Sequence, residues 1–190
     1  MQPATAIVTF ASTNQNKFRE VESILAMRGI QASFAKIELV EIQSDSLEEI
    51  AREKAKSAYA RVQKPVIVED DGLFVDALGG FPGQYSSYVF KTIGNAGVLK
   101  LLEGKQDRLA SFRSLVAFFD GNNLQLFEGK VQGRISEKIT EGGWGYDPIF
   151  APEGADVTFA ELADKKNDYS HRKKALEKFA EWQLLIQNRT

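Results

Sequence analysis

The sequence predicts an α/β fold built around a mixed, strongly twisted sheet, and two observations carry this prediction. Over the first half of the chain, short β-prone runs alternate with amphipathic helical patterns. Further along, the runs 109–119 and 124–135 flank Asp120-Gly121-Asn122-Asn123, which predicts a long antiparallel hairpin. The chain has 190 residues, 43% of them hydrophobic, and this length suits one domain spanning 1–190 or two lobes that share a core.

The first part of the chain predicts a strand, a helix and a second extended segment. Residues 6–11 form a short β-prone run, and the polar cluster 12–16 after it favours a turn or a helix cap. A helix that stops at Gly29 is then predicted by apolar residues at helical spacing, namely Phe18, Val21, Ile24 and Leu25. The second extended segment is expected at about 31–42.

A second helix and a buried strand lead into an acidic segment. Ser46 and Glu49 have the spacing of a capping box, so we expect a helix that begins there, continues to about Val62 and is ended by Pro65. The run 65–69 is typical of a buried strand, and Glu69-Asp70-Asp71-Gly72 is expected to form an acidic turn at its end.

The second half of the chain contributes the hairpin, two further helices and several loops. Residues 73–78 are expected to be extended, and 79–83 to be a loop because glycines there surround a proline. A helix is expected near 92–102, and 141–147 is a glycine-rich loop. The last helix is expected at about 170–187, with an apolar stripe at Leu176, Phe179, Trp182 and Ile186.

The composition excludes several classes of protein. Because the chain has no cysteine, disulfides, thiolate zinc sites and a cysteine nucleophile are ruled out. No apolar run approaches the roughly 18 residues of a membrane span, and the first residues lack the pattern of a signal peptide, so we expect a cytoplasmic protein without membrane contacts. A net charge of -2 gives no basic field for nucleic acid.

Residues 12–17 are the first candidate for a binding site, because they lie between a predicted strand and a predicted helix. The first turn of a helix offers free N–H groups and the positive end of a dipole, which suits a phosphate group, and Lys17 adds a full charge. The alternative is plain helix capping with a surface lysine, which is the commoner role of such a cluster.

The acidic segment 69–72 is the second candidate. Three adjacent carboxylates repel one another, so the sequence suits either a solvated surface turn or a site that holds a cation. Magnesium prefers hard oxygen ligands and often binds through one or two carboxylates together with substrate phosphates. The preceding apolar run delivers these carboxylates from a buried strand, and this favours a metal site.

Two further segments combine aromatic, glycine and basic residues. The loop 141–148 could present aromatic faces to a nucleotide base, or its rings could pack inward, which is the commoner arrangement. The segment 165–172 places basic residues at the start of the last helix, where the dipole disfavours them, so an anion or acidic group is expected nearby. Its His171 is the only histidine, which excludes a multi-histidine metal site.

Taken together and in this order, these segments resemble the inosine triphosphate pyrophosphatase family, also described as XTP/dITP diphosphatases. The resemblance spans almost the whole chain and is strongest to archaeal members. It is carried by Ala11–Lys17, Val68–Leu73, Ala77–Gly83, Trp144–Phe150, Phe159–Leu162 and Ser170–Arg172.

The resemblance implies hydrolysis of ITP, dITP and XTP to the monophosphate and pyrophosphate by a homodimer. It implies an elongated α/β fold with two lobes, a nucleotide cleft between them, and a requirement for Mg²⁺, for which Mn²⁺ could substitute. Carried over by position, Asp70 and Lys17 are catalytic, and Glu41 and Asp70 hold the metal. Lys54 lies near the triphosphate, and the phosphates are held by Ser12, Thr13, Asn14, Gln15, Asn16 and Lys17. The base and its surroundings are matched by Trp144, Gly145, Tyr146, Asp147, Lys166, Ser170, His171 and Arg172.

One departure from the family pattern concerns Asp71, which stands where the family commonly has serine or threonine. This change removes a hydroxyl donor and adds a charge, so the sequence leaves open whether Asp71 contacts substrate or binds metal through water. The alternative to hydrolysis is a nucleotide sensor of the same fold that binds without cleaving. Residues 81–90 are the expected dimer surface.

Overall fold

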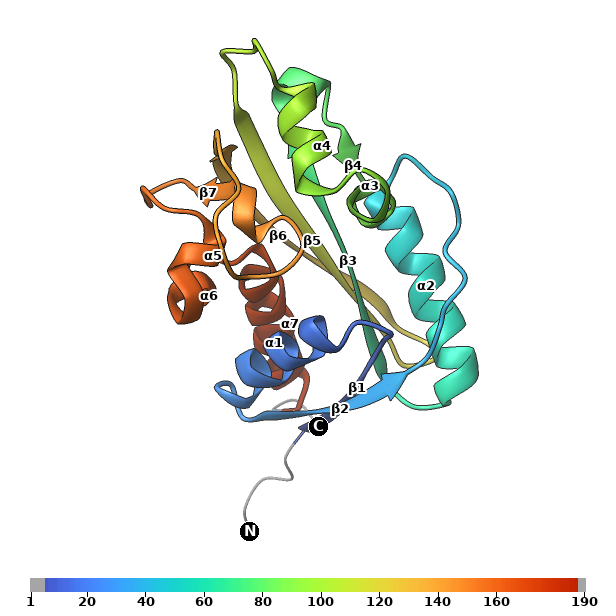
Figure 1. Cartoon of the computed structure of the whole chain (residues 1–190). Helices are drawn as coiled ribbons and strands as arrows, with labels where there is room; N and C mark the ends of the chain where they lie inside the picture. The colour runs from blue at the N-terminus through green and yellow to red at the C-terminus, as the bar shows by residue number, and fades with distance from the viewer. Residues whose placement is uncertain (1–5, 188–190) are drawn as a thin grey trace. The chain divides into compact units, whose positions relative to one another are not determined.

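The mixed α/β fold is confirmed in a computed structural model, which describes residues 6–187 (Figure 1). Seven strands form one sheet in the order β2-β1-β3-β5-β6-β7, with β4 paired to β3. The strands are β1 (Ala6–Ser12), β2 (Ile30–Lys36), β3 (Val66–Val75), β4 (Pro82–Gly83), β5 (Leu109–Phe119), β6 (Leu124–Ile135) and β7 (Phe150–Pro152). The helices are α1 (Gln15–Ala26), α2 (Leu47–Val62), α3 (Ser86–Thr92), α4 (Gly94–Leu101), α5 (Phe159–Leu162), α6 (Lys166–Tyr169) and α7 (His171–Gln187).

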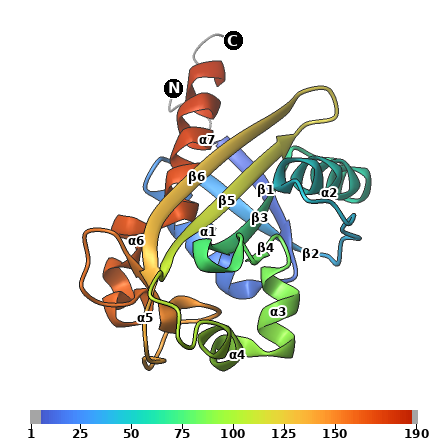
Figure 2. The same cartoon turned by 90° about the horizontal axis from the view of Figure 1, so that it is seen from above.

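The sheet combines parallel and antiparallel pairs. Strand β1 pairs in parallel with both β2 and β3, whereas β3 and β4 are antiparallel, as are β6 and β7. The expected hairpin is confirmed: β5 and β6 are neighbours in the sheet, joined by residues 120–123, and lie side by side in Figures 1 and 2.

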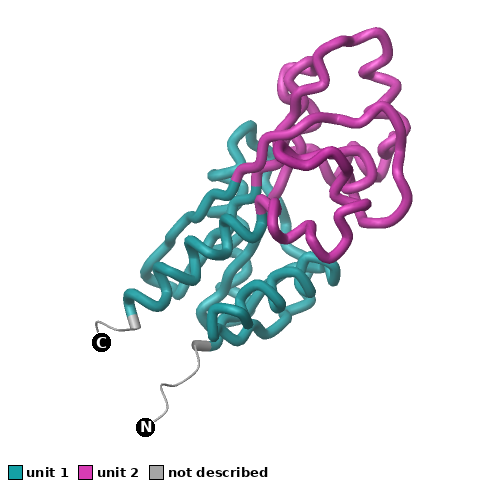
Figure 3. The backbone as a smooth tube through the Cα atoms, turned by 90° about the vertical axis from the view of Figure 1, so that its left-hand side faces the viewer, with its two compact units in different colours: residues 1–70, 114–129, 172–190 teal, residues 71–113, 130–171 magenta. Residues whose placement is uncertain are grey.

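The chain divides into two compact units (Figure 3). Of the described residues, unit 1 holds 6–70, 114–129 and 172–187, and unit 2 holds 71–113 and 130–171. Each unit has its own core of buried apolar residues. The expectation of a single domain spanning 1–190, with a nucleotide cleft between two lobes, stays a prediction.

Helix α1 forms where the apolar spacing predicts it. Its four stripe residues, Phe18, Val21, Ile24 and Leu25, are all buried in the core of unit 1. Helix α7 buries Leu176 and Phe179 in the same core, whereas Ile186 at the end of the expected stripe is 42% exposed. Among the helices within residues 6–187, none is long and apolar enough to cross a membrane.

Several expected boundaries are wrong for identifiable reasons. The extended segment expected to reach 42 ends as a strand at Lys36, where the pairing with β1 ends. Residues 76–78 form a 3₁₀ turn instead of strand, and Pro82–Gly83, expected as loop, pair with β3 as β4. Helix α3 was not expected, and Gly94, with a φ of 62°, separates it from α4.

The capping box at the start of α2 is confirmed in one half. The Ser46 hydroxyl accepts the backbone N–H of Glu49 at 3.2 Å. The returning half runs through Ser44, whose hydroxyl accepts the Ser46 N–H at 3.1 Å and donates to the Glu49 carboxylate at 2.6 Å. The first turn of α2 is therefore capped as in a capping box, except that the Ser44 hydroxyl bridges the Glu49 carboxylate and the Ser46 N–H.

Candidate functional site

The acidic segment is the interior of a strand and not the turn that the sequence suggests. Strand β3 continues through Glu69, Asp70 and Asp71 to Val75 because β4 pairs with it beyond them. At Gly72, a Cβ would lie 2.4 Å from the carbonyl oxygen of Gly83, so only glycine admits this approach. Side chains alternate along a strand, so Asp70 points to the face opposite that of Glu69 and Asp71. The Asp70 carboxylate is thereby kept apart from those of Glu69 and Asp71, which lowers the repulsion among the three.

Glu69 is the anchor of a buried charge cluster in unit 1. Its side chain is fully buried, and its Oε1 accepts the Ser114 hydroxyl at 2.7 Å and the Nε–H of Arg172 at 3.0 Å. Its Oε2 lies 3.0 Å from the Nζ of Lys17. Two cations and a hydroxyl therefore compensate one buried carboxylate, which is the condition under which such burial is tolerated.

Arg172, at the start of α7, is part of this cluster. Its side chain has no exposed area, and its Nη1 donates to the carboxylate of Glu20 on α1 while its Nε donates to Glu69. Two acidic groups close to this helix start meet the expectation that basic residues there have anionic neighbours. The role of Arg172 toward a base stays a prediction.

The two expected metal ligands, Glu41 and Asp70, are brought to one cation. The Nζ of Lys54 on α2 donates to the carboxylate of Glu41 and lies 3.4 Å from Oδ1 of Asp70. The Asp70 side chain is 15% exposed and that of Glu41 is 52% exposed. Both carboxylates therefore contact the same ammonium group. They lie 29 positions apart in the sequence and both belong to unit 1.

The capping interpretation of residues 12–17 is confirmed. Asn14 is the N-cap of α1, and its Oδ1 accepts the backbone N–H groups of Asn16 and Lys17 at 3.0 and 3.2 Å. The Ser12 hydroxyl accepts the Asn14 N–H at 3.1 Å. Exposed side chains in this segment are Thr13, Gln15 and Asn16. Phosphate binding at the same helix start is untested and stays a prediction.

In unit 2, Asp147 and Lys166 form a buried ion pair against aromatic rings. The Nζ of Lys166 lies 2.8 Å from Oδ2 of Asp147, and both side chains are at most 10% exposed. The same ammonium lies 4.9 Å from the ring centroid of Trp144 and 5.7 Å from that of Phe159. Asp147 Oδ2 also accepts the Trp144 backbone N–H at 3.1 Å, which closes the loop on itself.

The other aromatic residue of this loop, Tyr146, packs inward. Its hydroxyl donates to the carbonyl oxygen of Ser86 at 2.8 Å, and its ring meets Phe90 edge-on at 5.4 Å. Burial of the Tyr146 phenol raises its pKa well above the ordinary value. The adjacent Gly145 accepts a hydrogen bond from Asn95 Nδ2 at 3.0 Å.

Asp71 faces the single histidine within unit 2. Its Oδ2 lies 3.8 Å from Nε2 of His171, whose ring stacks on Phe112 with centroids 4.6 Å apart and planes 8° apart. His171 is 3% exposed and the preceding Ser170 is 1% exposed. Burial against an aromatic ring and a carboxylate fixes the imidazole in place.

The expected site residues divide between the units by their expected role. Those assigned to phosphate and metal lie in unit 1, and those assigned to the base lie in unit 2, with Arg172 as the exception in unit 1. Sequence reasoning missed Glu20, Ser114 and Phe112, which hold Arg172, Glu69 and His171. None of the three carried a local signal for its contact, because each meets a residue that is distant in the sequence.

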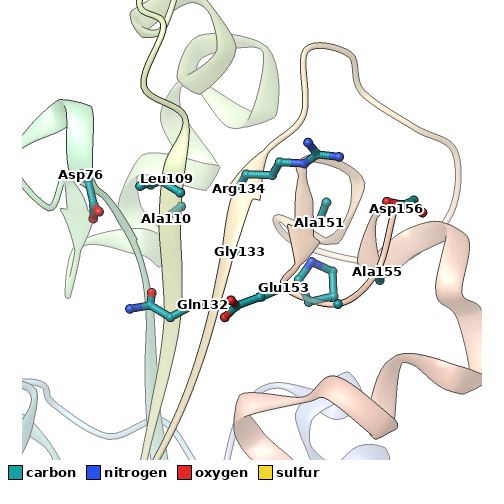
Figure 4. A pocket seen from close by; sticks show the side chains of 12 residues that line it. Asp76, Leu109, Ala110, Gln132, Gly133, Arg134, Ala151, Glu153, Ala155 and Asp156 are labelled. Atoms are coloured by element: carbon teal, nitrogen blue, oxygen red, sulfur yellow. The ribbon is translucent and has the colours of Figure 1, made fainter.

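Unit 2 also has a pocket of about 620 Å³ (Figure 4). Its lining includes the apolar residues Leu109, Ala110 and Ala151 and the charged residues Asp76, Arg134 and Glu153. None of the site residues expected from the sequence lines this pocket, so its volume adds nothing to the assignment of those residues.

The fold and the site together describe a mixed α/β protein with adjacent carboxylates, Glu69 and Asp70, on an inner strand of the sheet. Each of these two carboxylates lies beside at least one lysine. A family model described as the Ham1 family matches residues 8–182. The chain belongs to the Ham1 family, which confirms the resemblance drawn from the sequence.

Similar proteins agree over nearly the full length. The chain is 53% identical over 178 residues to a dITP/XTP pyrophosphatase of Methanopyrus kandleri, covering 92% of this chain and 95% of that protein. It is 47% identical over 177 residues to a dITP/XTP pyrophosphatase of Thermococcus kodakarensis, covering 92% and 96%. A solved HAM1 protein of Coxiella burnetii superposes with a TM-score of 0.82 at 28% identity, covering 94% of this chain and 98% of that one.

Proposed function

We propose that this protein is a nucleoside triphosphate pyrophosphatase that hydrolyses ITP, dITP and XTP to the monophosphate and pyrophosphate. The observation that carries the proposal is the full-length similarity to proteins named dITP/XTP pyrophosphatase, at 53% and 47% identity. The charge arrangement supports it, because the residues expected to meet a metal and a triphosphate gather around two lysines of unit 1. Removal of deaminated nucleotides from the cytoplasmic pool is the corresponding role.

The proposed cofactor is a divalent metal, Mg²⁺ with Mn²⁺ as a substitute. Its fit rests on Glu41 and Asp70, which already converge on one positive charge, the Lys54 ammonium. Two carboxylates with further positions left for water and phosphate oxygens match the ligand preference of magnesium. When bound, such a metal supplies charge neutralisation at the reacting phosphate.

At the phosphate end, we assign Lys17 and the first turn of α1 to the triphosphate. Glu69, itself fixed by Arg172, pairs with the Lys17 ammonium, so this charge is oriented before substrate arrives. The N–H groups and hydroxyls of residues 12–16 add donors at the positive end of a helix dipole. Asp70, the carboxylate left at the partly exposed face of β3, accepts the proton of the attacking water. Water attacks the α-phosphorus, and pyrophosphate leaves.

At the base end, we assign Trp144 to stacking and the Asp147–Lys166 pair to recognition. Asp147 can accept the N1–H that a hypoxanthine or xanthine ring has and adenine lacks, and Lys166 can donate to the carbonyl oxygen at position 6. With ATP, the donor would face an amine in a desolvated site, and such mispairing gives strong discrimination. We also assign Ser170 and His171, which follow Lys166 by four and five positions at the start of α7, to the surroundings of the base.

The proposed assembly is a homodimer formed through residues 81–90. Four large side chains in this segment are exposed by 38–70%, namely Phe81, Tyr85, Tyr88 and Phe90. A surface of that kind is typical of an interface between subunits. Analytical sedimentation checks this assembly. The wild type is expected to be a dimer and Tyr88→Glu a monomer, and a monomeric wild type contradicts the proposal.

The deciding experiment is a product assay with MgCl₂ across dITP, ITP, XTP, GTP and ATP, measuring pyrophosphate and phosphate separately. Pyrophosphate release from dITP, ITP and XTP, with little from ATP, is expected. Phosphate without pyrophosphate would move the cleavage away from the α-phosphorus. Tight dITP binding without either product would make the protein a sensor and overturn the proposal.

A further inference from the structure

A corner between two short helices supports the loop that we assign to the base. Helix α3 ends at Thr92, and Gly94, in a left-handed conformation with a φ of 62°, starts α4. At Gly97, a Cβ would lie 2.4 Å from the Cβ of Ile93, so this glycine lets Ile93 pack directly against α4. Glycines at both positions therefore fix the corner, and Asn95 lies within it on the first turn of α4.

Asn95 reaches from this corner to the loop Trp144–Asp147. Its Nδ2 donates to the carbonyl oxygen of Gly145 at 3.0 Å. Its Oδ1 is buried, and no donor among the described residues reaches it. A buried amide kept only for packing is normally satisfied at both ends. The single bond that this carboxamide makes to protein is the one to the loop, so the loop is what it serves.

The loop needs such support because glycine dominates its backbone. Positive φ values of 87°, 65° and 61° occur at Gly142, Gly143 and Gly145. Glycine populates positive and negative φ about equally, so these residues alone do not fix the conformation of the loop. The loop is fixed on one side by the hydrogen bond from Asp147 back to the Trp144 N–H. The hydroxyl of Tyr146 bonds to Ser86 on α3, which gives a second point. The carbonyl oxygen of Gly145, one residue after Trp144, is a third point, and among the described residues the side chain that bonds to it is Asn95.

We propose that Asn95 is a positioning residue for purine recognition, acting through Gly145 on the orientation of the Trp144 ring. This inference rests on the proposed function in assigning the purine to Trp144, but the Asn95–Gly145 contact is independent of it. Asn95 would set how well the ring stacks on a base and leave the handling of the triphosphate unchanged.

The test compares Asn95→Ala and the nearly isosteric Asn95→Asp with Asn122→Ala, an exposed asparagine in the β5–β6 turn. Loss of one neutral hydrogen bond should raise the KM for dITP about 3- to 10-fold, with kcat within about twofold. Inorganic tripolyphosphate lacks a base, so its inhibition constant should not change. The thermal midpoint should stay near that of the wild type, and Asn122→Ala should match the wild type throughout.

A second measurement keeps the inference separate from the proposed activity. The chain has two tryptophans, so Trp182→Phe leaves Trp144 as the single reporter. In that background, Asn95→Ala should increase acrylamide quenching of Trp144 fluorescence. Unchanged quenching overturns the role of Asn95 whatever the KM, as does a parallel loss of tripolyphosphate affinity and thermal stability. Increased quenching with an unchanged KM overturns its part in purine recognition. A wild type that cleaves none of the triphosphates refutes the proposed function alone, and the quenching result still decides Asn95.

Discussion

The substitution Glu69→Gln removes one negative charge from the centre of the unit 1 cluster while nearly preserving shape. Glu69 and Arg172 have no exposed side-chain area, and Lys17 is 13% exposed. Glutamine can still accept the Ser114 hydroxyl, so the change isolates charge from volume. What remains is a buried guanidinium that has lost one of its two carboxylates.

The expected cost lies at the lower end of the range for breaking a buried ion pair. Removal of one partner costs about 3–5 kcal/mol when the other charge stays buried without compensation. Arg172 retains Glu20, and Lys17 retains some contact with solvent, so both cations keep part of their compensation. We therefore expect the free energy of unfolding to fall by about 3 kcal/mol.

Equilibrium urea unfolding followed by circular dichroism measures this loss. With a slope of about 2 kcal/mol per molar urea, a loss of about 3 kcal/mol lowers the midpoint by about 1.5 M. Ser114→Ala is the matched control, because it removes a hydrogen bond to the same carboxylate but leaves the charge, and it should cost about 2 kcal/mol. A Glu69→Gln loss no larger than that of Ser114→Ala would show that charge is not what holds the cluster together.

Three further outcomes are expected. Asp70→Asn should lower turnover of dITP by about 10²–10⁴ without changing the fold, measured by pyrophosphate release and circular dichroism; near-normal turnover would remove Asp70 from its role. Gly72→Ala should cost about 2 kcal/mol of stability in urea, because its Cβ would lie 2.4 Å from a backbone oxygen, and an unchanged midpoint would contradict the β3–β4 contact. The raised pKa of the Tyr146 phenol favours proton binding in the folded state, so this residue's contribution is complete below the ordinary pKa of about 10 and declines as the pH rises above it. The stability difference between wild type and Tyr146→Phe should therefore be constant up to about pH 9.5 and shrink from about pH 10 to 11.5; a difference that stays constant over that range argues against burial of the phenol.

Elements with a strong local signal could be predicted from the sequence. Helix α1 is predicted by four apolar residues at helical spacing, and the β5–β6 hairpin by two β-prone runs on either side of a turn. The extended residues on both sides of the acidic segment could be predicted, but not the continuity of strand β3 through 70–72, because it depends on pairing with Pro82–Gly83 and charged residues alone favour a turn. Helix α3 could not be predicted, because its seven residues have no capping side chain to mark where it begins.

The candidate site was predictable residue by residue but not contact by contact. The motifs identified Lys17, Asp70 and Arg172, whereas their partners depend on long-range packing. Arg172 and Glu69 are 103 positions apart, and nothing in the sequence links them. The resemblance assigns Arg172 to the base by its position in the motif, and that role stays a prediction. The structure shows its pairing with Glu69 and Glu20 in unit 1.

The three adjacent carboxylates of β3 are compatible with folding because each has a different positive or polar partner. Glu69 is compensated by Lys17 and Arg172, Asp70 by Lys54, and Asp71 lies beside His171. Strand alternation separates Asp70 from its neighbours and makes it the one that shares a cation with Glu41. Their chemical roles can therefore differ although they are adjacent. Glu69 is committed to structure, Asp70 is the carboxylate that can exchange its lysine for a metal, and Asp71 belongs to the surroundings of the imidazole. A serine or threonine at position 71, as is common in the family, would remove the carboxylate that lies beside His171, and a role of Asp71 toward substrate or metal stays a prediction.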